Sequence, residues 1–364
     1  AMVFFPAFLY NGCMDKKKLL LIDGSSVAFR AFFALYQQLD RFKNDNGLHT
    51  NAIYGFHLML NHLLERVQAS HILVAFDAGK TTFRTEMYAD YKGGRAKTPD
   101  EFREQFPFIR ELLDHLGIRH YELAQYEADD IIGTLGRLAE KESFDVTIVS
   151  GDKDLIQLTD EHTVVEISKK GVAEFEAFTP EYLMEKMGLT PAQFIDLKAL
   201  MGDKSDNIPG VTKIGEKTGI KLLLEHGSLE GIYENIDGMK ASKMKENLVN
   251  DKEQAFLSKT LATIDTKAPI EIGLDDLVYS GPNVESLGKF YDEMGFKQLK
   301  QALNASQANQ AETLNFTVVD KVSEDMLSAD SIFHFELFGE NYHTDDLIGF
   351  AWSCGDKLYA TDKL

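Results

Sequence analysis

The sequence has only two cysteines, no long apolar run and no excess of positive charge, and each shortage excludes a class of protein. Cys13 and Cys354 stand near opposite ends of the 364 residues. They can form neither a disulfide framework nor a cysteine-rich zinc site, which indicates a reducing, cytoplasmic setting. The longest apolar run, Val3–Tyr10, is too short to cross a bilayer and follows no basic stretch. We therefore expect neither a transmembrane helix nor a secretory signal.

The net charge of −20 argues against a general binder of polyanions, because phosphate recognition normally uses a basic surface. The charge is unevenly spread, however. Residues 306–364 contain eleven Asp and Glu against three Lys, whereas residues 80–97 contain five Lys and Arg against two acids. An acidic chain with such basic islands can bind nucleic acid if its surplus carboxylates bind cations.

Apolar patterns predict alternating strands and helices in the first half of the chain. The buried strands are expected over residues 19–22, 72–76 and 146–149, and helices over 52–67 and 127–141. This alternation is typical of a parallel sheet with helices on both faces. After residue 180 the pattern is mainly helical, and beyond a low-complexity stretch it becomes strand-like again. The expected parts are a leader at 1–15, an α/β domain at 16–180, a helical subdomain at 181–304, a linker at 305–312 and a truncated α/β segment at 313–364.

Acidic side chains stand where the predicted strands end. Asp23 follows the first of them, Asp77 the second, and Asp152 and Asp154 the last. The carboxyl ends of strands in an open parallel sheet meet at one crevice, where ligands bind. Five more acids have reason to lie in the same region, namely Glu127, Asp129 and Asp130 at the start of a helix and Asp203 and Asp206 in a later loop.

Nine carboxylates in one region repel one another unless cations lie between them. Ligation by oxygen alone favours Mg²⁺ or Mn²⁺, and two such ions about 4 Å apart are the usual arrangement for in-line displacement at phosphorus. A plainer interpretation stays open for single residues: Asp23 can cap the next helix, and residues 127–130 can be the acidic first turn that a helix dipole favours. A covalent aspartyl phosphate is disfavoured, because Ser25 stands where that mechanism needs an acid.

Residues 83–95 mix cations with aromatic side chains. A solvated mobile loop is one interpretation of this composition. The other is a lid over the metal site, in which Arg84 and Lys92 neutralise a transferring phosphate and Tyr88 or Tyr91 stacks on an unpaired base.

A turn at residues 208–215 separates two predicted helices. Gly210 and Gly215 allow tight backbone turns, and the amides at the start of the second helix can face a phosphate. Lys213, Lys217 and Lys221 add positive charge that does not depend on base sequence. The pattern is typical of a helix-hairpin-helix that binds a duplex backbone, and a plain pair of helices is the alternative.

Five motifs occur in order: LLLIDGSSVAFRAF, VAFDAGKTTFRTEMYADYKGGR, YEADDIIGTL, VSGDKDLIQL and MGDKSDNIPGVTKIGEKTGIKLL. Over about residues 16–304 they closely resemble the 5′ nuclease domain of bacterial DNA polymerase I, a relative of the flap endonucleases. The resemblance implies a PIN-like α/β domain and a helix-three-turn-helix (H3TH) subdomain that binds duplex DNA. It also implies metal-dependent 5′→3′ exonuclease and 5′ flap endonuclease activity.

By motif position, the resemblance implies a first metal group of Asp23, Asp77, Glu127 and Asp129, and a second of Asp130, Asp152, Asp154, Asp203 and Asp206. It implies that Arg30, Arg84 and Lys92 are the catalytic cations near the phosphate. We expect DNA contacts from Tyr88, Tyr91, Arg95, Gly210, Val211, Lys213, Gly215, Lys217 and Lys221. The resemblance also implies a potassium ion on backbone oxygens of the 210–215 turn, where Thr212-Lys213 replaces the Pro-Gly of many relatives.

From about Thr313 the chain resembles the start of a 3′→5′ exonuclease-like domain. It reads His334-Phe335-Glu336 where active relatives carry Asp-x-Glu, so we expect no proofreading. We expect a monomeric, nucleoid-associated N-terminal part of a polymerase that acts on 5′ flaps, nicked or gapped duplexes and RNA primer–DNA junctions. Two alternatives are a DNA-binding accessory module without catalysis and a ribonuclease of the same α/β type.

Overall fold

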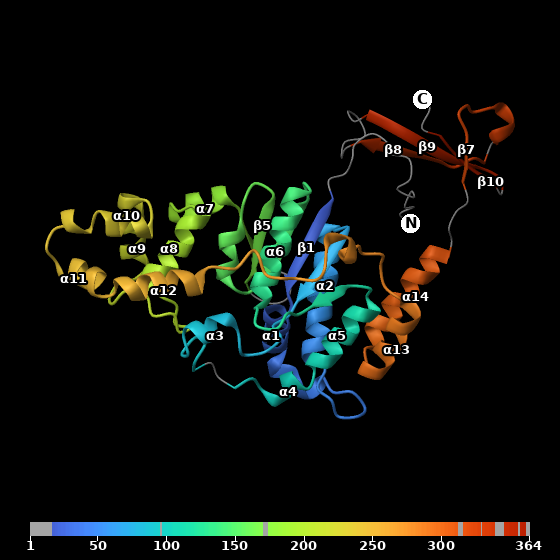
Figure 1. Ribbon diagram of the computed structural model, residues 1–364. Helices are drawn as coiled ribbons and strands as arrows, with labels where there is room; N and C mark the ends of the chain where they lie inside the picture. The colour runs from blue at the N-terminus through green and yellow to red at the C-terminus, as the bar shows by residue number, and fades with distance from the viewer. Residues whose placement is uncertain are drawn as a thin grey trace. The chain divides into compact units, whose positions relative to one another are not determined.

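The computed structural model describes residues 17–94, 97–169, 174–311, 316–328, 330–338, 346–355 and 357–361. The predicted leader at 1–15 and the predicted DNA contact Arg95 lie outside these ranges. The chain divides into two compact units, Lys16–Lys300 and one that contains Gln301–Leu364, and each has its own sheet (Figure 1).

A six-stranded sheet forms the centre of the first unit, with the strand order β3-β2-β1-β4-β5-β6. All neighbours pair in parallel except β5 and β6, which are antiparallel. The parallel sheet expected from the sequence is therefore present. The strands are β1 (Lys18–Asp23), β2 (His71–Ala75), β3 (Arg119–Tyr121), β4 (Asp145–Ser150), β5 (Thr163–Ser168) and β6 (Phe175–Phe178).

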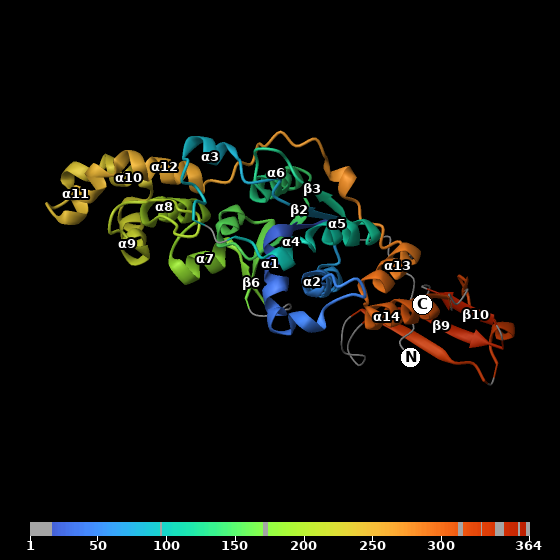
Figure 2. The same cartoon turned by 90° about the horizontal axis from the view of Figure 1, so that it is seen from below.

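Helices cover both faces of this sheet (Figures 1 and 2). Leu19 and Leu21 of β1 lie in one buried cluster with Ile131 and Leu135 of α6 (Ala128–Lys141). Leu20 and Ile22 of β1 are equally buried and point to the opposite face, where α1 (Gly24–Ala34) contacts the sheet. A strand that is buried on both faces shows a continuous apolar run, which is the pattern read from the sequence.

The remaining elements connect the strands or pack around the sheet and its helices. They are η1 (Tyr36–Arg41), α2 (Asn51–Val67), α3 (Phe83–Met87), α4 (Asp100–Arg103), α5 (Phe106–His115), η2 (Lys153–Leu158), η4 (Leu274–Leu277) and α13 (Val284–Met294). Among them, α2 contacts α1, α13 contacts α5, and η4 contacts β2 and α6. The lid predicted at 83–95 thus begins as a short helix, and only its residues up to Gly94 are described.

A helical lobe occupies one end of the first unit (Figures 1 and 2). Leu197 and Leu200 pack with Leu222 in a core of its own. Gly210 has a φ of +63°, and a Cβ there would lie 2.2 Å from the backbone nitrogen of Gly202, so only glycine fits. The lobe contains α7 (Pro180–Met187), α8 (Pro191–Met201), α9 (Glu216–His226), α10 (Leu229–Glu234), η3 (Ile236–Gly238), α11 (Lys243–Asn250) and α12 (Lys252–Ala262).

The second unit has a four-stranded sheet with the order β7-β10-β9-β8. The four strands predicted after residue 313 are present as β7 (Phe316–Val318), β8 (Phe333–Phe338), β9 (Asp346–Cys354) and β10 (Lys357–Thr361), with η5 (Glu324–Met326) between the first two. The predicted linker at 305–312 is helical as far as Ala311, as the end of α14 (Lys297–Ala311). Its Ala and Gln residues favour a helix and it contains neither Gly nor Pro. None of the helices in the described ranges combines the length and apolar character needed to cross a bilayer.

Candidate active site

Carboxylates gather at the carboxyl ends of the central strands. Asp23 ends β1, Asp77 follows β2, Asp152 follows β4, and Asp129 lies in the first turn of α6. Burial, followed by the charges of Asp77 and Asp152, raises the pKa of Asp23 to about 7. Burial and the charges of Asp23 and Asp152 raise the pKa of Asp129 well above its usual value. Asp23 therefore lies within reach of the charges of Asp77 and Asp152, and Asp129 within reach of those of Asp23 and Asp152.

Hydroxyl and backbone groups hold the strand-end acids in place. The Ser26 N–H donates to Asp23 Oδ1 at 3.0 Å, so Asp23 does cap α1, as the plainer interpretation expects. The buried Ser150 hydroxyl donates to the other oxygen, Asp23 Oδ2, at 2.7 Å and accepts the Asp152 N–H at 2.9 Å. Ser150 therefore ties the end of β1 to the turn after β4, a role that the sequence interpretation missed.

The nine predicted metal ligands fall into two sets by their charge partners. Among the described residues, no lysine or arginine forms an ion pair with Asp23, Asp77, Asp129 or Asp152, which we call the unpaired quartet. The other five are paired with three cations of the chain: Asp130 and Glu127 with Arg84, Glu127 and Asp206 with Lys92, and Asp154 and Asp203 with Lys198.

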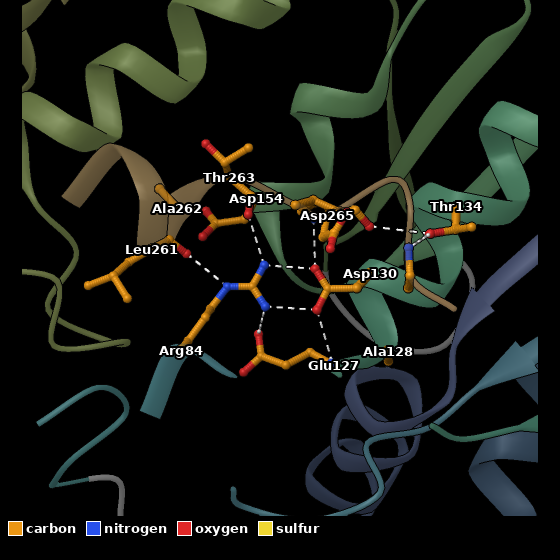
Figure 3. A network of polar contacts seen from close by, with 12 residues as sticks. Arg84, Glu127, Ala128, Asp130, Thr134, Asp154, Leu261, Ala262, Thr263 and Asp265 are labelled. Carbon is orange, nitrogen blue, oxygen red and sulfur yellow. Dashed lines mark hydrogen bonds and ion pairs between the residues drawn. The ribbon is translucent and has the colours of Figure 1, made fainter. Parts of the chain in front are cut away.

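Arg84 and Asp130 form a buried pair (Figure 3). The guanidinium, 2% exposed, donates to both carboxylate oxygens of Asp130 at 2.8 and 2.7 Å and to the carbonyls of Leu261 and Thr263. Asp130, fully buried, also accepts the N–H groups of Glu127 and Asp265. This arrangement does not favour a role for Arg84 at a transferring phosphate or for Asp130 as a metal ligand, because each uses its hydrogen-bonding capacity on the protein. Both roles stay predictions.

The end of the predicted lid packs against the helical lobe. Tyr91 is 5% exposed and lies in a buried cluster with Ile208, so it does not stack on a base as the sequence predicts. Burial and the charge of Glu127 raise the pKa of Tyr91, and its protonated hydroxyl donates to Glu127 at 3.1 Å. Lys92 donates to Glu127 Oε1 at 2.7 Å, and its backbone N–H donates to the Asp206 carbonyl. Tyr88 is half-buried against the same cluster.

Lys198 joins the two chain segments that carry the last three predicted ligands. It lies on α8, and its Nζ is 2.5 Å from Asp154 Oδ1 and contacts Asp203. Burial opposes the charged form of Asp203, but hydrogen bonds from Lys198 and Ser205 outweigh it and lower the Asp203 pKa to about 2. Burial and the charge of Asp152 raise the pKa of Asp154 to about 7 in spite of Lys198. The sequence interpretation missed Lys198, whose one signal is a lysine within the apolar stretch FIDLKALM.

Arg30 and the hairpin lysines remain accessible. Arg30 is half-buried beside a hollow of about 430 Å³ that Ser26, Phe29 and Gly151 also line, and burial lowers its pKa. The three lysines predicted to contact DNA are exposed: Lys213 in the hairpin, and Lys217 and Lys221 on α9.

Val211 of the same hairpin is buried, and its N–H donates to the Leu200 carbonyl, so this residue packs in the lobe rather than facing a duplex. Gly210 is needed for its close approach to Gly202, whereas Gly215 is exposed and precedes the first turn of α9.

Within the described ranges, no three Asp, Glu, His or Cys side chains are arranged to hold a metal ion as they stand. The unpaired quartet nevertheless fits a divalent ion by its chemistry. It offers oxygen donors alone. Burial and mutual repulsion raise the pKa values of Asp23 and Asp129, and the charge of Lys92 only partly offsets this for Asp129.

Comparison with solved structures gives the class of fold. T5 5′-exonuclease with bound zinc ions superposes with a TM-score of 0.59 at 24% identity, over 76% of this chain and 98% of that one. The catalytic core of Rad2 in complex with DNA superposes with a TM-score of 0.54 at 17% identity, over 80% of this chain and 91% of that one. The chain thus has the resolvase-like, PIN nuclease fold with a helical subdomain, as the sequence predicts.

Family models identify the chain more closely. The model of the 5′-3′ exonuclease, N-terminal resolvase-like domain, matches residues 18–188, and that of the 5′-3′ exonuclease, C-terminal SAM fold, matches residues 189–285. The chain belongs to the 5′-3′ exonuclease family, which confirms the expected nuclease class.

The chain is similar to the DNA polymerase I of several bacteria. It is 90% identical to that of Streptococcus pneumoniae over 351 residues, which are 96% of this chain and 40% of that protein. It is 66% identical to that of Lactococcus lactis over 359 residues, 96% of this chain and 41% of that protein. The chain thus spans about two fifths of the length of these relatives.

Proposed function

We propose that this chain hydrolyses DNA phosphodiester bonds at 5′ ends and at 5′ flaps, with divalent metal ions bound at the strand ends. The observation that carries the proposal is the unpaired quartet, Asp23, Asp77, Asp129 and Asp152, none of which forms an ion pair with a described lysine or arginine. The family of the chain supports it, as do the divalent ions named for T5 5′-exonuclease. Mg²⁺ or Mn²⁺ is the cation we expect, because all the donors are oxygens.

The unpaired quartet would hold the first ion. When bound, such an ion activates water and stabilises the charge that develops on the phosphate. The chain's own residues do the rest. Ser150 holds Asp23 and the 152 turn in one orientation by its two hydrogen bonds, and the N-cap bond from Ser26 fixes the other oxygen of Asp23.

Two cations are placed to meet the substrate phosphate. Arg30 lies at the hollow beside Ser26 and Gly151, at the same end of the sheet as the quartet. Lys92, 25% exposed, is tied to Glu127 and can turn towards a phosphate when that carboxylate finds another partner. We assign these two residues the phosphate-neutralising role and give Arg84 a structural one.

The helical lobe would bind the duplex. Lys217 and Lys221 are exposed and lie one turn apart on the same face of α9. Lys213 is exposed in the turn just before that helix, and the three charges can meet a phosphate backbone. A potassium ion at the hairpin stays a prediction. It would share the Gly210 and Thr212 carbonyls with Gln254 and Asn247, which already donate to them.

The wider role follows from the relatives. Because the chain matches the DNA polymerase I of several bacteria over two fifths of their length, we propose that it works beside a polymerase domain. It would remove RNA primers and the flaps displaced during repair synthesis, as a monomer.

A flap assay tests the proposal. A 5′-labelled flap duplex, a nicked duplex and the same flap with RNA in its 5′ arm are incubated with Mg²⁺, with and without EDTA. Cleavage that needs the metal and leaves a 5′-phosphate and a 3′-hydroxyl is expected, and Asp152→Ala with Asp154→Ala should abolish it. Glu285→Gln is the matched control, since this exposed acid pairs only with Lys289 on α13 among the contacts described. Binding without cleavage under any metal would instead identify an accessory module, and preference for the RNA arm a ribonuclease.

A further inference from the structure

Lys198 holds a position that the proposed function leaves unexplained. Like Lys92, it contacts two predicted metal ligands from different segments of the chain, here Asp154 after β4 and Asp203 after α8. Its side chain is 14% exposed. The two carboxylates lie 49 residues apart in the sequence, so the lysine joins the catalytic sheet to the helical lobe.

The backbone around Lys198 gives the ammonium little freedom. Its helix neighbours Leu197, Ala199 and Leu200 are buried in the core of the lobe. The loop that carries Asp203 is closed by two backbone hydrogen bonds with Ile208. Asp203 is further held by the N–H and hydroxyl of Ser205. The carboxylates therefore come to the lysine on rigid elements, and the contact does not depend on a loose side-chain pairing.

The Lys198 ammonium and a divalent ion would compete for the same position between the carboxylates of Asp154 and Asp203. Both are compact cations that gather oxygen atoms, and an ammonium donates up to three hydrogen bonds to them. The lysine Nζ lies at hydrogen-bonding distance from Asp154 and Asp203, which is where an ion shared by those two carboxylates would have to sit. Asp152, the next acid in the turn, has no such partner among the described residues.

We propose that the Lys198 ammonium is the resident cation of the Asp154–Asp203 pair, and that a divalent ion binds these two carboxylates only by displacing it. The unpaired quartet binds its ion without any such displacement. The two metal sites therefore differ in affinity. The unpaired quartet binds its ion tightly, whereas Lys198 sets the weaker affinity of Asp154 and Asp203 for theirs. This inference rests on the proposed metal-dependent function and attributes the weaker binding of the second metal ion to one residue, Lys198.

Metal binding by the full chain tests the inference without any measurement of cleavage. Mn²⁺ is titrated into metal-free protein, and free Mn²⁺ is counted by electron paramagnetic resonance for the wild type, Lys198→Met and Lys198→Arg. Methionine keeps the length of the side chain and removes the charge, whereas arginine keeps the charge. Lys186→Met is the matched control, because it breaks a lysine–carboxylate pair on α7, with Glu176, that has no part in the site.

Lys198→Met is expected to bind the weaker Mn²⁺ about tenfold more tightly or better, since the ion no longer breaks charged hydrogen bonds worth at least that factor. The tighter class should not change. Lys198→Arg and Lys186→Met should bind like the wild type. Unchanged or weaker binding of the second ion by Lys198→Met overturns the inference, as does Lys198→Arg behaving like Lys198→Met.

Thermal unfolding gives a second readout. In EDTA, Lys198→Met should melt below the wild type, because Asp154 and Asp203 lose their counter-ion, and excess Mn²⁺ should raise its melting temperature by more than it raises that of the wild type. Equal metal-induced shifts contradict the inference. If neither the wild type nor any variant binds Mn²⁺, both the proposed function and the inference fail. If Mn²⁺ binds equally well with and without the Lys198 charge, only the inference fails.

Discussion

The Asp23 side chain is buried, with only 5% of its surface exposed, and the charges of Asp77 and Asp152 repel its ionised form. Its pKa rises from 3.8 to about 7. A carboxyl whose pKa is higher in the folded state stabilises the fold fully below the unfolded pKa, and this contribution is lost as the pH rises through the folded pKa. The metal-free protein should therefore lose stability between about pH 4 and pH 7 on account of this residue.

Asp23→Asn removes that charge and keeps the oxygen that caps α1. In EDTA at pH 8 we expect the variant to be more stable than the wild type by about 2 kcal/mol, half of what the full pKa shift corresponds to, and to show no gain near pH 4. Urea unfolding at both pH values measures the difference. Asp40→Asn is the control, at an acid whose side chain is 96% exposed and pairs with a lysine. A variant less stable than the wild type at pH 8 would mean that burial and the neighbouring carboxylates do not destabilise ionised Asp23.

For the Arg84–Asp130 pair we expect the opposite effect: removing one of the two charges should lower the stability of the fold. Both groups are buried and hydrogen-bonded on every side, so loss of one partner leaves the other unpaired, which costs about 3 to 5 kcal/mol. We expect Arg84→Ala and Asp130→Ala each to be strongly destabilised, and Arg84→Met with Asp130→Leu to lose much less than the sum of the two. Chemical denaturation of the four proteins gives the coupling energy. Arg84→Ala with normal stability and impaired cleavage would restore the role at the phosphate that the sequence predicts.

At the scale of elements, the sequence predicts the strands but not the contacts between distant side chains. Residues 19–22, apolar without alternation, predict a strand buried on both faces, and β1 is one. The Asp after each strand likewise places Asp23 and Asp77 at one edge of the sheet. The pairing of Arg84 with Asp130 and Thr263 could not be foreseen, because it joins residues 46 and 179 positions apart and depends on how the lobe packs on α6.

The same limit applies to side chains whose chemistry suits two environments. Tyr91 and Val211 stand in segments with the composition of a nucleic-acid surface, and both are buried. An aromatic ring in a basic segment can stack on a base or fill a core, and periodicity over so few residues does not distinguish the two. Lys198 shows the converse, a lysine in an apolar helix whose partner acids come from packing.

The hairpin and α9 carry a prediction of their own, on the binding of duplex DNA. Replacing Lys213, Lys217 and Lys221 with Ala should weaken binding to duplexes of any sequence and lower the slope of log K against log salt by about one for each phosphate that the protein no longer neutralises. Stability should be unaffected, since all three side chains are exposed. Fluorescence anisotropy at several salt concentrations measures the slope. Lys289→Ala, an exposed lysine on α13, is the control, and an unchanged slope in the triple variant would place the duplex elsewhere.

At the scale of the whole molecule, each of the two units is held together by its own set of hydrogen bonds. In the described ranges, strands β1 to β6 form one sheet and β7 to β10 another, and no strand of one pairs with a strand of the other. The first unit is completed by α13, where the Tyr291 hydroxyl lies 2.5 Å from His57 Nε2 and Asn44 donates to the Glu293 carbonyl. The first unit ends at Lys300, shortly after α13, and the sheet that follows belongs to the second unit.

Two truncations test where the nuclease part ends. A chain shortened after Ala311 keeps every contact of α13, so we expect its melting temperature and its cleavage of a 5′ flap to match those of the full chain. A chain shortened after Gly281 loses Leu287, Phe290 and Tyr291, which are buried, and leaves His57 facing solvent. Loss of buried side chains of this size costs several kcal/mol, so the shorter chain should melt well below the longer one. Calorimetry of the three proteins decides the matter: if removal of residues 312–364 lowers the melting temperature of the nuclease transition as much as removal of α13 does, the two sheets do not fold independently.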